Sequence, residues 1–311
     1  MPQVHLRQFC FPDGQGKLFV VKKSDGKEFW SHPKNICAIK NGNRNEHLTN
    51  PDLLEQLYAI FEPNYPRAID AIRERKPPLF AREVISAFVA SIAVSAPTFQ
   101  RMLFPTTEDL LISQALELNA QEEFPPFPET DNLDYSGKSL PDLLKNGLLK
   151  FEIDMKMPQA LASARLQNVI HAFSSAHWDI LHNSSGIGFL TSDYTLALLE
   201  ENSGRHLARF IPLAPDIGII IYTPAAGVKL TAPSQCYYEV NSKSKIATLN
   251  RCVVKSAENF VISNSSPEWL TAIVKKYRQF HLVVDARTQK LEYKEGPMLP
   301  IRKFTQQAKG G

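Results

Sequence analysis

Residues 186–194 carry the pattern that most suggests chemistry. An apolar run ends there on Ser192 and Asp193, and a strand that ends on an ionisable side chain presents it at a sheet edge, where sites are often built. A carboxylate in that place can act as a general base, a metal ligand or a clamp on a substrate. The alternative is structural, with Ser192 or Asp193 capping a helix over residues 194–200.

Two further polar residues stand where local structure alone does not favour them. Asn250 shares the apolar face of a helix expected over residues 241–257, and a buried amide must find hydrogen-bond partners. It either bonds to a neighbouring loop or reaches the region of Asp193 as a site residue. Glu62 ends an earlier helix, where the helix dipole disfavours a carboxylate; it is either a surface side chain or a functional one.

The histidines and cysteines lack the spacing of a metal site. No two of the eight histidines form H-E-x-x-H, and none of the four cysteines forms C-x-x-C, so neither a zinc site nor a redox motif is expected. Strand alternation places His177 and Asp179 on one face of a strand and Trp178 on the other. A metal site at this strand stays open as an alternative without a motif to support it, and the predicted site residues include no metal ligands.

Other catalytic motifs do little to distinguish between classes of enzyme. The nuclease half-motif Asp/Glu-x-Lys occurs four times, so its presence alone carries no information. Asp285 and Glu292, with Lys294 nearby, could converge on Mg²⁺, which leaves a divalent metal open as a cofactor. The chain has no P-loop, no G-x-G-x-x-G and no G-x-S-x-G, which disfavours P-loop nucleotide hydrolysis and α/β-hydrolase chemistry.

Composition points to a cytoplasmic globular protein. The 35 basic and 32 acidic side chains nearly balance, so the net charge favours neither nucleic acid nor a membrane, although a local basic groove stays open. Sparse, scattered cysteines suggest a reducing compartment. The N-terminus lacks the apolar stretch of a signal peptide. The longest apolar run, residues 84–96, is too short to span a bilayer and is expected to be a buried helix.

The order of elements predicts an α+β fold. It begins with a β-hairpin, residues 17–22 and 27–30 around an Asp-Gly turn, within a first fifty residues expected to be β structure. A helical middle follows, and the C-terminal half combines a mixed or antiparallel sheet with helices. The expected helices cover residues 50–62, 66–75, 84–92, 106–118, 141–149, 158–173, 241–257 and 267–277. The expected strands are 177–181 and 186–190, which form a hairpin, then 209–213, 217–222, 260–262 and 281–284.

Two segments are expected to lie outside the packed fold. Residues 121–139 form an acidic, Pro-rich loop, interpreted as a solvated linker or as a flap that contacts a basic partner. Residues 301–311 are polar and expected to be a disordered tail.

Four stretches resemble the bacterial protein family of unknown function numbered 4238. They are residues 2–9, similar to the end of its H-Y-V-P-Q-F-Y-L-R-x-F signature, residues 58–62, similar to its helix ending in Glu, residues 178–193, similar to its W…F-I-T-S-D block, and residues 249–262, similar to its N…A-E-x-x-V segment. Together they span nearly the whole chain. The resemblance implies one family-length domain, residues 1–300.

The resemblance also implies a set of site residues. It implies Asp193 and Glu62 as catalytic groups. The implied binding residues are Ser192, which would orient Asp193, and Asn250, Trp178 and Arg7.

The chain departs from the family pattern in three places. The family's leading His precedes Met1, its S-D-N-P reads S-D-Y-T at residues 192–195, and no Arg precedes Pro97. If that His takes part in chemistry, these departures imply an inactive protein, a differently wired one, or a start upstream of Met1.

Two functions follow as hypotheses. The first is a hydrolase that acts on nucleic acid or a nucleotide in a bacterial defence or toxin setting, with Asp193, Glu62 and Asn250 converging on one pocket. The alternative is a non-catalytic binding protein with a vestigial site and a protein partner. Neither hypothesis involves a membrane.

Overall fold

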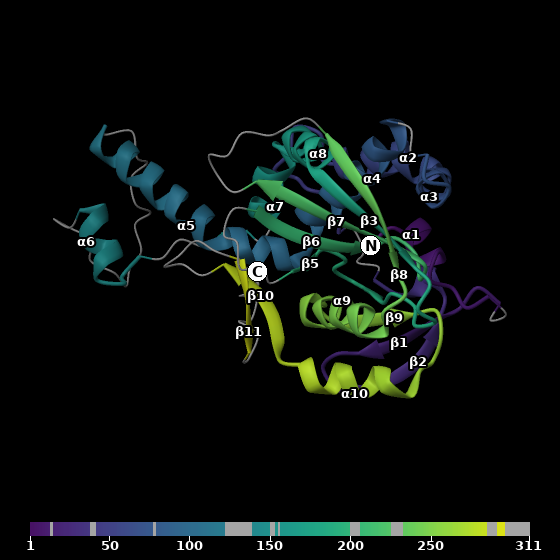
Figure 1. Ribbon diagram of the computed structural model, residues 1–311. Coiled ribbons are helices and arrows are strands. Elements are labelled where there is room, and N and C mark those ends of the chain that lie inside the picture. Colours follow the sequence, from purple (N-terminus) through teal and green to yellow (C-terminus); the bar gives the residue numbers. More distant parts are fainter. Residues whose placement is uncertain are drawn as a thin grey trace.

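The computed structural model describes residues 1–12, 15–37, 42–76, 79–121, 139–149, 153–154, 156–199, 206–224, 233–284 and 291–295 (Figure 1). Its helices and two main sheets make an α+β protein, as the sequence predicts. The acidic loop between residues 121 and 139 lies almost wholly outside the described residues, as do the C-terminal tail, Asp285 and the side chain of Glu292.

The first sheet contains the predicted N-terminal hairpin. Its strands, in spatial order, are β2 (Glu28–Ser31), β1 (Leu18–Lys22), β9 (Phe260–Ser263) and β4 (Thr191–Ser192). All neighbours are antiparallel, and Val20 of β1 lies opposite Ile262 of β9. A strand near the N-terminus is therefore joined to two segments from the second half of the chain.

The second sheet has five strands. In spatial order they are β5 (Ala197–Leu198), β6 (His206–Pro212), β7 (Ile217–Pro224), β3 (His177–Asn183) and β8 (Ser234–Val240). Among the described residues, the β3–β8 pair is parallel and the other pairs of this sheet are antiparallel. A separate antiparallel pair follows, β10 (Phe280–Val284) with β11 (Leu291–Glu295).

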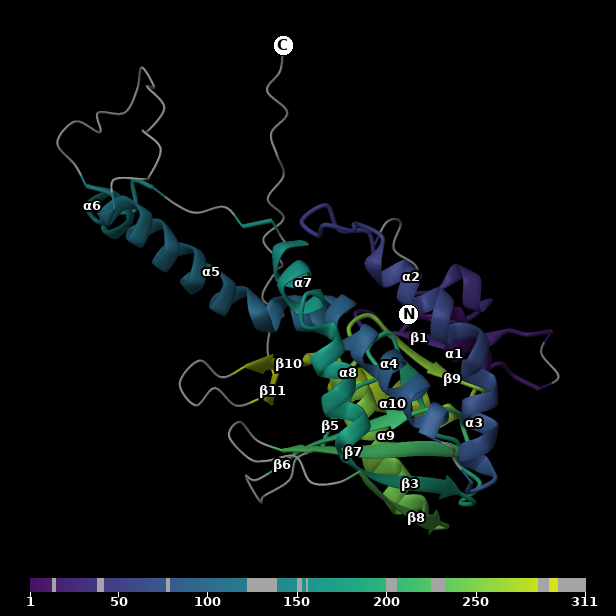
Figure 2. The ribbon, with the colours of Figure 1, turned by 90° about the horizontal axis from the view of Figure 1, so that it is seen from above.

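The helices cover the sheets from several sides. They are α1 (Gln3–Arg7), α2 (Leu53–Phe61), α3 (Tyr65–Arg73), α4 (Leu79–Ser95), α5 (Pro97–Ala120), α6 (Leu140–Lys145), α7 (Lys156–Ser163), α8 (Leu166–Ser175), α9 (Lys243–Ser256) and α10 (Glu268–Tyr277), with short 3₁₀ helices η1 (Pro33–Asn35) and η2 (Glu62–Asn64). From above, α5 leads away from the body towards α6 (Figure 2).

Three predictions of secondary structure need correction. The first fifty residues are not all β structure, because α1 forms directly after Pro2; at five residues it is too short to show an apolar period. The segment 158–173 is two helices, α7 and α8, separated near Arg165. Helix α5 begins at Pro97 and continues through Pro105 rather than starting after it.

The hairpin predicted from residues 177–181 and 186–190 is wrong. Strand β3 pairs with β7 and β8 instead, and residues 186–190 form no strand before the chain enters β4 of the other sheet. Phe189 and Leu190 pack in the apolar core between the sheets. The backbone of this segment bonds to side chains and loops instead of a strand, so apolar content misled the prediction.

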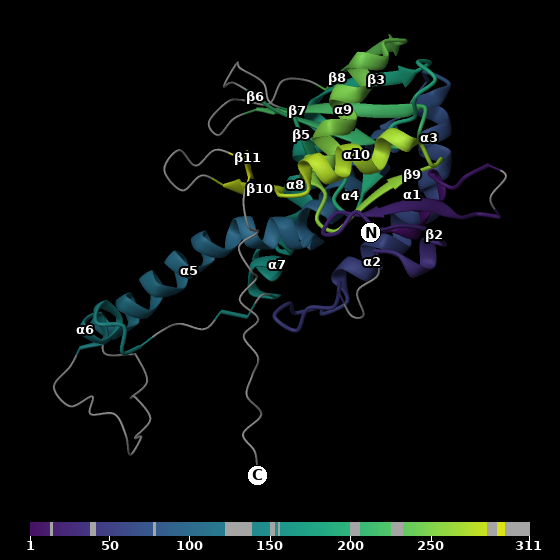
Figure 3. The same ribbon diagram turned by 90° about the horizontal axis from the view of Figure 1, so that it is seen from below.

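Helix α9 lies between the two sheets and α10 packs beside it (Figures 1 and 3). Ile246 and Val253 of α9 share one apolar cluster with Val21 of the first sheet and with Leu181 and Phe210 of the second. The opposite face of the second sheet packs against α4 and α8 through a larger cluster. Sheet, helix and sheet therefore form one continuous interior.

Helix α4 is the buried helix that the apolar run predicts. Most of its residues are buried, including Ile85, Phe88 and Val89. Over the described part of the chain no single helix has the length and apolar character needed to cross a membrane; α4 and α5 reach them only as a pair bent by 59°.

Candidate functional site

A cavity of about 990 Å³ lies where the N-terminal segment, α2, the α4–α5 junction and the α9–β9 turn meet. Its polar wall combines four carboxylates with two cationic side chains. These are Glu55, Glu62, Asp193 and Glu258, and Arg7 and Lys156. The volume is typical of a pocket for a small organic ligand.

Asp193 follows β4 and bonds to the α9–β9 turn. Its Oδ1 accepts the backbone N–H of Glu258 at 2.9 Å, and its Oδ2 accepts that of Asn259 at 2.8 Å. Burial is the largest effect on the carboxyl and, with the nearby charge of Glu258, outweighs these bonds and raises the pKa of Asp193 to about 6. Asp193 therefore takes up or releases a proton close to neutral pH.

Asp193 does not cap a helix. The helix that would be capped, residues 194–200, is absent, because Ala197 and Leu198 form β5 and pair with β6. Ser192 instead closes a tight turn: its Oγ accepts the N–H of Tyr194 at 3.2 Å and donates to the Tyr194 carbonyl at 2.6 Å. Ser192 thus shapes the turn that carries Asp193.

Glu62 lies on the same cavity at the junction of α2 and η2. Burial, and secondarily the charge of Glu55, raises the pKa of Glu62, while Arg7 opposes the change. Arg7 ends α1 and is exposed at the cavity wall. The cavity therefore holds two carboxyls with raised pKa values beside a guanidinium.

Glu258, which lines the cavity, belongs to a buried ion pair. Glu258 accepts hydrogen bonds from Thr98 and from Arg101, and only 7% of its side chain is exposed. This pair joins the start of α5 to the α9–β9 turn. A buried carboxylate that is paired and hydrogen-bonded in this way is held in one position.

Lys23 fixes the same turn from the other side. Its buried Nζ donates to the carbonyls of Lys255 at 3.0 Å, Ala257 at 2.5 Å and Phe280 at 2.7 Å. Burial lowers the pKa of Lys23 to about 8. A cation at the C-terminus of α9 satisfies carbonyls that the helix leaves unpaired.

The other predicted binding residues have contacts elsewhere. Trp178, Ser192 and Asn250 are not among the described residues that line the cavity. Trp178 is buried beneath the Arg82 guanidinium, 4.3 Å from its carbon to the ring centre, and its indole N–H donates to Phe173. Asn250 accepts the N–H of Leu190 at 2.9 Å and donates to the Gly188 carbonyl at 3.0 Å.

Sequence reasoning missed Glu258, Arg101 and Lys23. Glu258 stands in the stretch Ala-Glu-Asn that resembles the family's late motif, so the motif itself was a usable signal. It also missed His5, which is buried between the Tyr65 hydroxyl at 2.8 Å and Thr191 Oγ1 at 2.9 Å. Burial lowers the pKa of His5 to about 3, so it is neutral at physiological pH.

Side chains that could hold a metal ion gather away from this cavity. In the described ranges, three donors of the His, Cys, Asp or Glu type converge only at His177, Asp179 and Cys236 on the second sheet. The cavity carboxylates are not part of that group.

The model of a family described as "Protein of unknown function (DUF4238)" matches residues 1–267, and the chain belongs to that family. The match covers Arg7, Glu62, Asp193 and Glu258. No curated protein and no solved structure matches the chain.

Proposed function

We propose that this protein is a hydrolase in which Asp193 and Glu62 act as a general acid–base pair. The observation that carries the proposal is that two carboxyls with raised pKa values line one cavity beside Arg7. Perturbed ionisable groups that share a concave pocket are typical of active sites.

The two carboxyls take different roles. Asp193, whose pKa rises to about 6, keeps a proton in part of the molecules near neutral pH and serves as the acid. Glu62 is the base and removes a proton from the attacking water, while Asp193 donates one to the leaving group. Each Asp193 oxygen has more than one lone-pair direction, so the backbone bonds leave room for this proton.

The proposed substrate is a nucleotide or a nucleic-acid end. The cavity volume fits a ligand of nucleotide size, and Arg7 offers the planar donor pair that suits a phosphate. Lys156 adds a second cation at the wall, although its Nζ also donates to the carbonyls of Gly42 and Arg44.

The second candidate is a binding protein with no catalysis. It is favoured by the two backbone N–H groups that Asp193 accepts, because they give this carboxylate a structural task at the α9–β9 turn. In that case the cavity would hold a ligand without converting it.

The experiment compares purified wild type with Asp193→Asn and Glu62→Gln on nucleotides, on single-stranded RNA and DNA, and on bis-p-nitrophenyl phosphate. We expect each variant to lose about 10²- to 10⁴-fold in rate on the nucleotides, the RNA and the DNA. The nitrophenolate leaving group needs no acid, so Asp193→Asn should retain activity on the nitrophenyl ester while Glu62→Gln should not.

The matched control is Glu55→Gln, a carboxylate of the same cavity without a proposed chemical role. It should keep its activity, with the ionisation of Glu62 moved to lower pH because a neighbouring negative charge is gone. If wild type hydrolyses none of these substrates but one of them binds in the cavity, the binding function replaces the hydrolase. Growth arrest on expression that Asp193→Ala abolishes would support a toxin or defence setting.

A further inference from the structure

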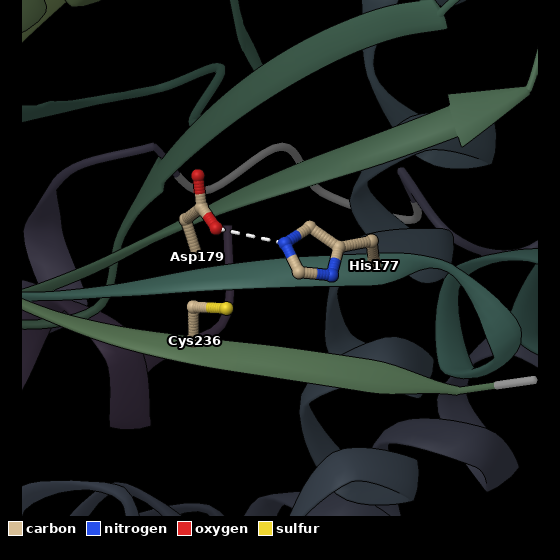
Figure 4. Close-up of side chains that lie close together, drawn as sticks. All are labelled: His177, Asp179 and Cys236. Atoms are coloured by element: carbon tan, nitrogen blue, oxygen red, sulfur yellow. Dashed lines mark hydrogen bonds and ion pairs between the residues drawn. The ribbon is translucent and has the colours of Figure 1, made fainter.

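A second group of reactive side chains lies on the five-stranded sheet, apart from the cavity. His177 and Asp179 project from β3 and Cys236 projects from the neighbouring edge strand β8 (Figure 4). Their donor atoms all lie within 4.8 Å of one another, and His177 Nε2 is 2.9 Å from Asp179 Oδ1. We propose that these three side chains bind a zinc-type transition metal ion.

The register of the sheet brings the three ligands together. Asp179 of β3 lies directly opposite Cys236 of the parallel strand β8, and His177 is two residues earlier on the same face of β3. The sequence positions, 177, 179 and 236, have no zinc-motif spacing, so only the parallel pairing reveals the group. The absence of C-x-x-C therefore does not exclude this site.

Two of the proposed ligands, His177 and Asp179, have partners that hold them in place. His177 Nδ1 lies 2.7 Å from Ser234 Oγ, and the Tyr222 hydroxyl donates to Asp179 Oδ2 at 2.9 Å. Such outer partners fix the tautomer and orientation of metal-binding side chains.

The metal-binding atoms are the ones that these outer partners do not occupy. When the ring proton is on Nδ1 and donated as a hydrogen bond to Ser234 Oγ, the lone pair of His177 Nε2 is available to bind the metal, and a proton held between Nε2 and Asp179 Oδ1 leaves to solvent as the metal binds. The Cys236 thiol loses its proton to solvent and binds as thiolate. Zinc bond lengths place tetrahedral ligands about 3.3–3.8 Å apart, so binding requires His177 Nε2 and Asp179 Oδ1, now 2.9 Å apart, to separate slightly and the exposed Cys236 to adjust its position.

The donor set selects the kind of metal. One thiolate, one imidazole and one carboxylate suit Zn²⁺ and related transition ions, whereas Mg²⁺ and Ca²⁺ prefer oxygen alone. Three protein ligands leave a fourth position for water or another ligand. Because β8 is an edge strand and Cys236 is exposed, an ion can enter from solvent.

The test titrates the chelator-treated full chain with Zn²⁺ in a calorimeter and with Co²⁺ in an absorption spectrometer. We expect one Zn²⁺ per chain, no Mg²⁺ binding, and a thiolate-to-cobalt absorption band. Cys236→Ser should remove the band and Asp179→Asn should weaken Zn²⁺ binding at least tenfold, while the distant Cys10→Ser matches wild type. No Zn²⁺ binding by wild type, or equal binding by Cys236→Ser, overturns the proposal.

Two gentler variants guard against loss of folding. Ser234→Ala and Tyr222→Phe keep all three ligands and should each weaken Zn²⁺ binding by about tenfold to hundredfold. Unchanged affinity in both would contradict the outer partners described above. The metal site does not depend on the proposed hydrolase, so Asp193→Asn should bind Zn²⁺ as wild type does.

Discussion

At the scale of single residues, Asp193 combines a structural and a chemical property. Its carboxylate receives two backbone N–H groups, which favour the ionised form, yet burial raises its pKa to about 6. A change from 3.8 to about 6 corresponds to roughly 3 kcal/mol between the two protonation states. The protein therefore holds ionised Asp193 at a cost in stability near neutral pH.

This cost predicts how stability depends on pH. The folded state binds more protons than the unfolded state between about pH 4 and 6, so the Asp193 contribution is fully present below pH 4 and is lost as pH rises through 6. The free energy of unfolding of wild type minus that of Asp193→Asn should fall by about 3 kcal/mol across this range. Urea unfolding at several pH values measures it; a difference that is flat with pH would show that Asp193 does not titrate there.

The sequence identifies single residues at the ends of strands and helices, but not the residues they pair with. Asp193 and Glu62 stand out because local structure does not explain them. Glu258 and Arg101 escaped because their pairing joins positions far apart in the sequence. His177, Asp179 and Cys236 escaped for the same reason, since their proximity depends on which strands pair.

At the scale of elements, the Asn250 side chain makes backbone hydrogen bonds that a neighbouring strand would otherwise make. The segment before β4 was predicted to form a hairpin with β3, but the Asn250 side chain bonds to the Leu190 N–H and the Gly188 carbonyl. A helix side chain thus satisfies backbone groups that a ladder would otherwise take. The apolar pattern predicted the burial of Phe189 and Leu190 correctly; it carries no information on which partner their backbone finds.

Replacing Asn250 should therefore be costly. Asn250→Ala removes the partner of the buried Leu190 N–H and of the partly buried Gly188 carbonyl, and we expect a loss of about 2–4 kcal/mol in the free energy of unfolding. Arg251→Ala is the matched control, because it is the next residue of α9 and is exposed; its effect should stay within about 0.5 kcal/mol. Equal effects of the two variants in urea unfolding would refute this account.

At the scale of the whole molecule, α9 links the two sheets through shared apolar packing. Its apolar residues contact both sheets, and its C-terminal turn carries the N–H groups that hold Asp193. Composition and element order predict an α+β class with a hairpin first and a sheet late. They do not predict that β1 of the hairpin pairs with β9, because pairing across more than two hundred residues depends on tertiary packing.

A cavity made in α9 should consequently loosen both sheets together. Ile246 is fully buried between them, and Ile246→Ala should lower the free energy of unfolding by about 2–5 kcal/mol. Ile60→Ala, at a side chain 69% exposed on α2, serves as control and should change little. Hydrogen exchange followed by mass spectrometry should show protection falling equally in β1 and in β7, since these strands share the core around α9. Loss of protection in one sheet alone would mean that the sheets unfold as separate units, and α9 would then belong to only one of them.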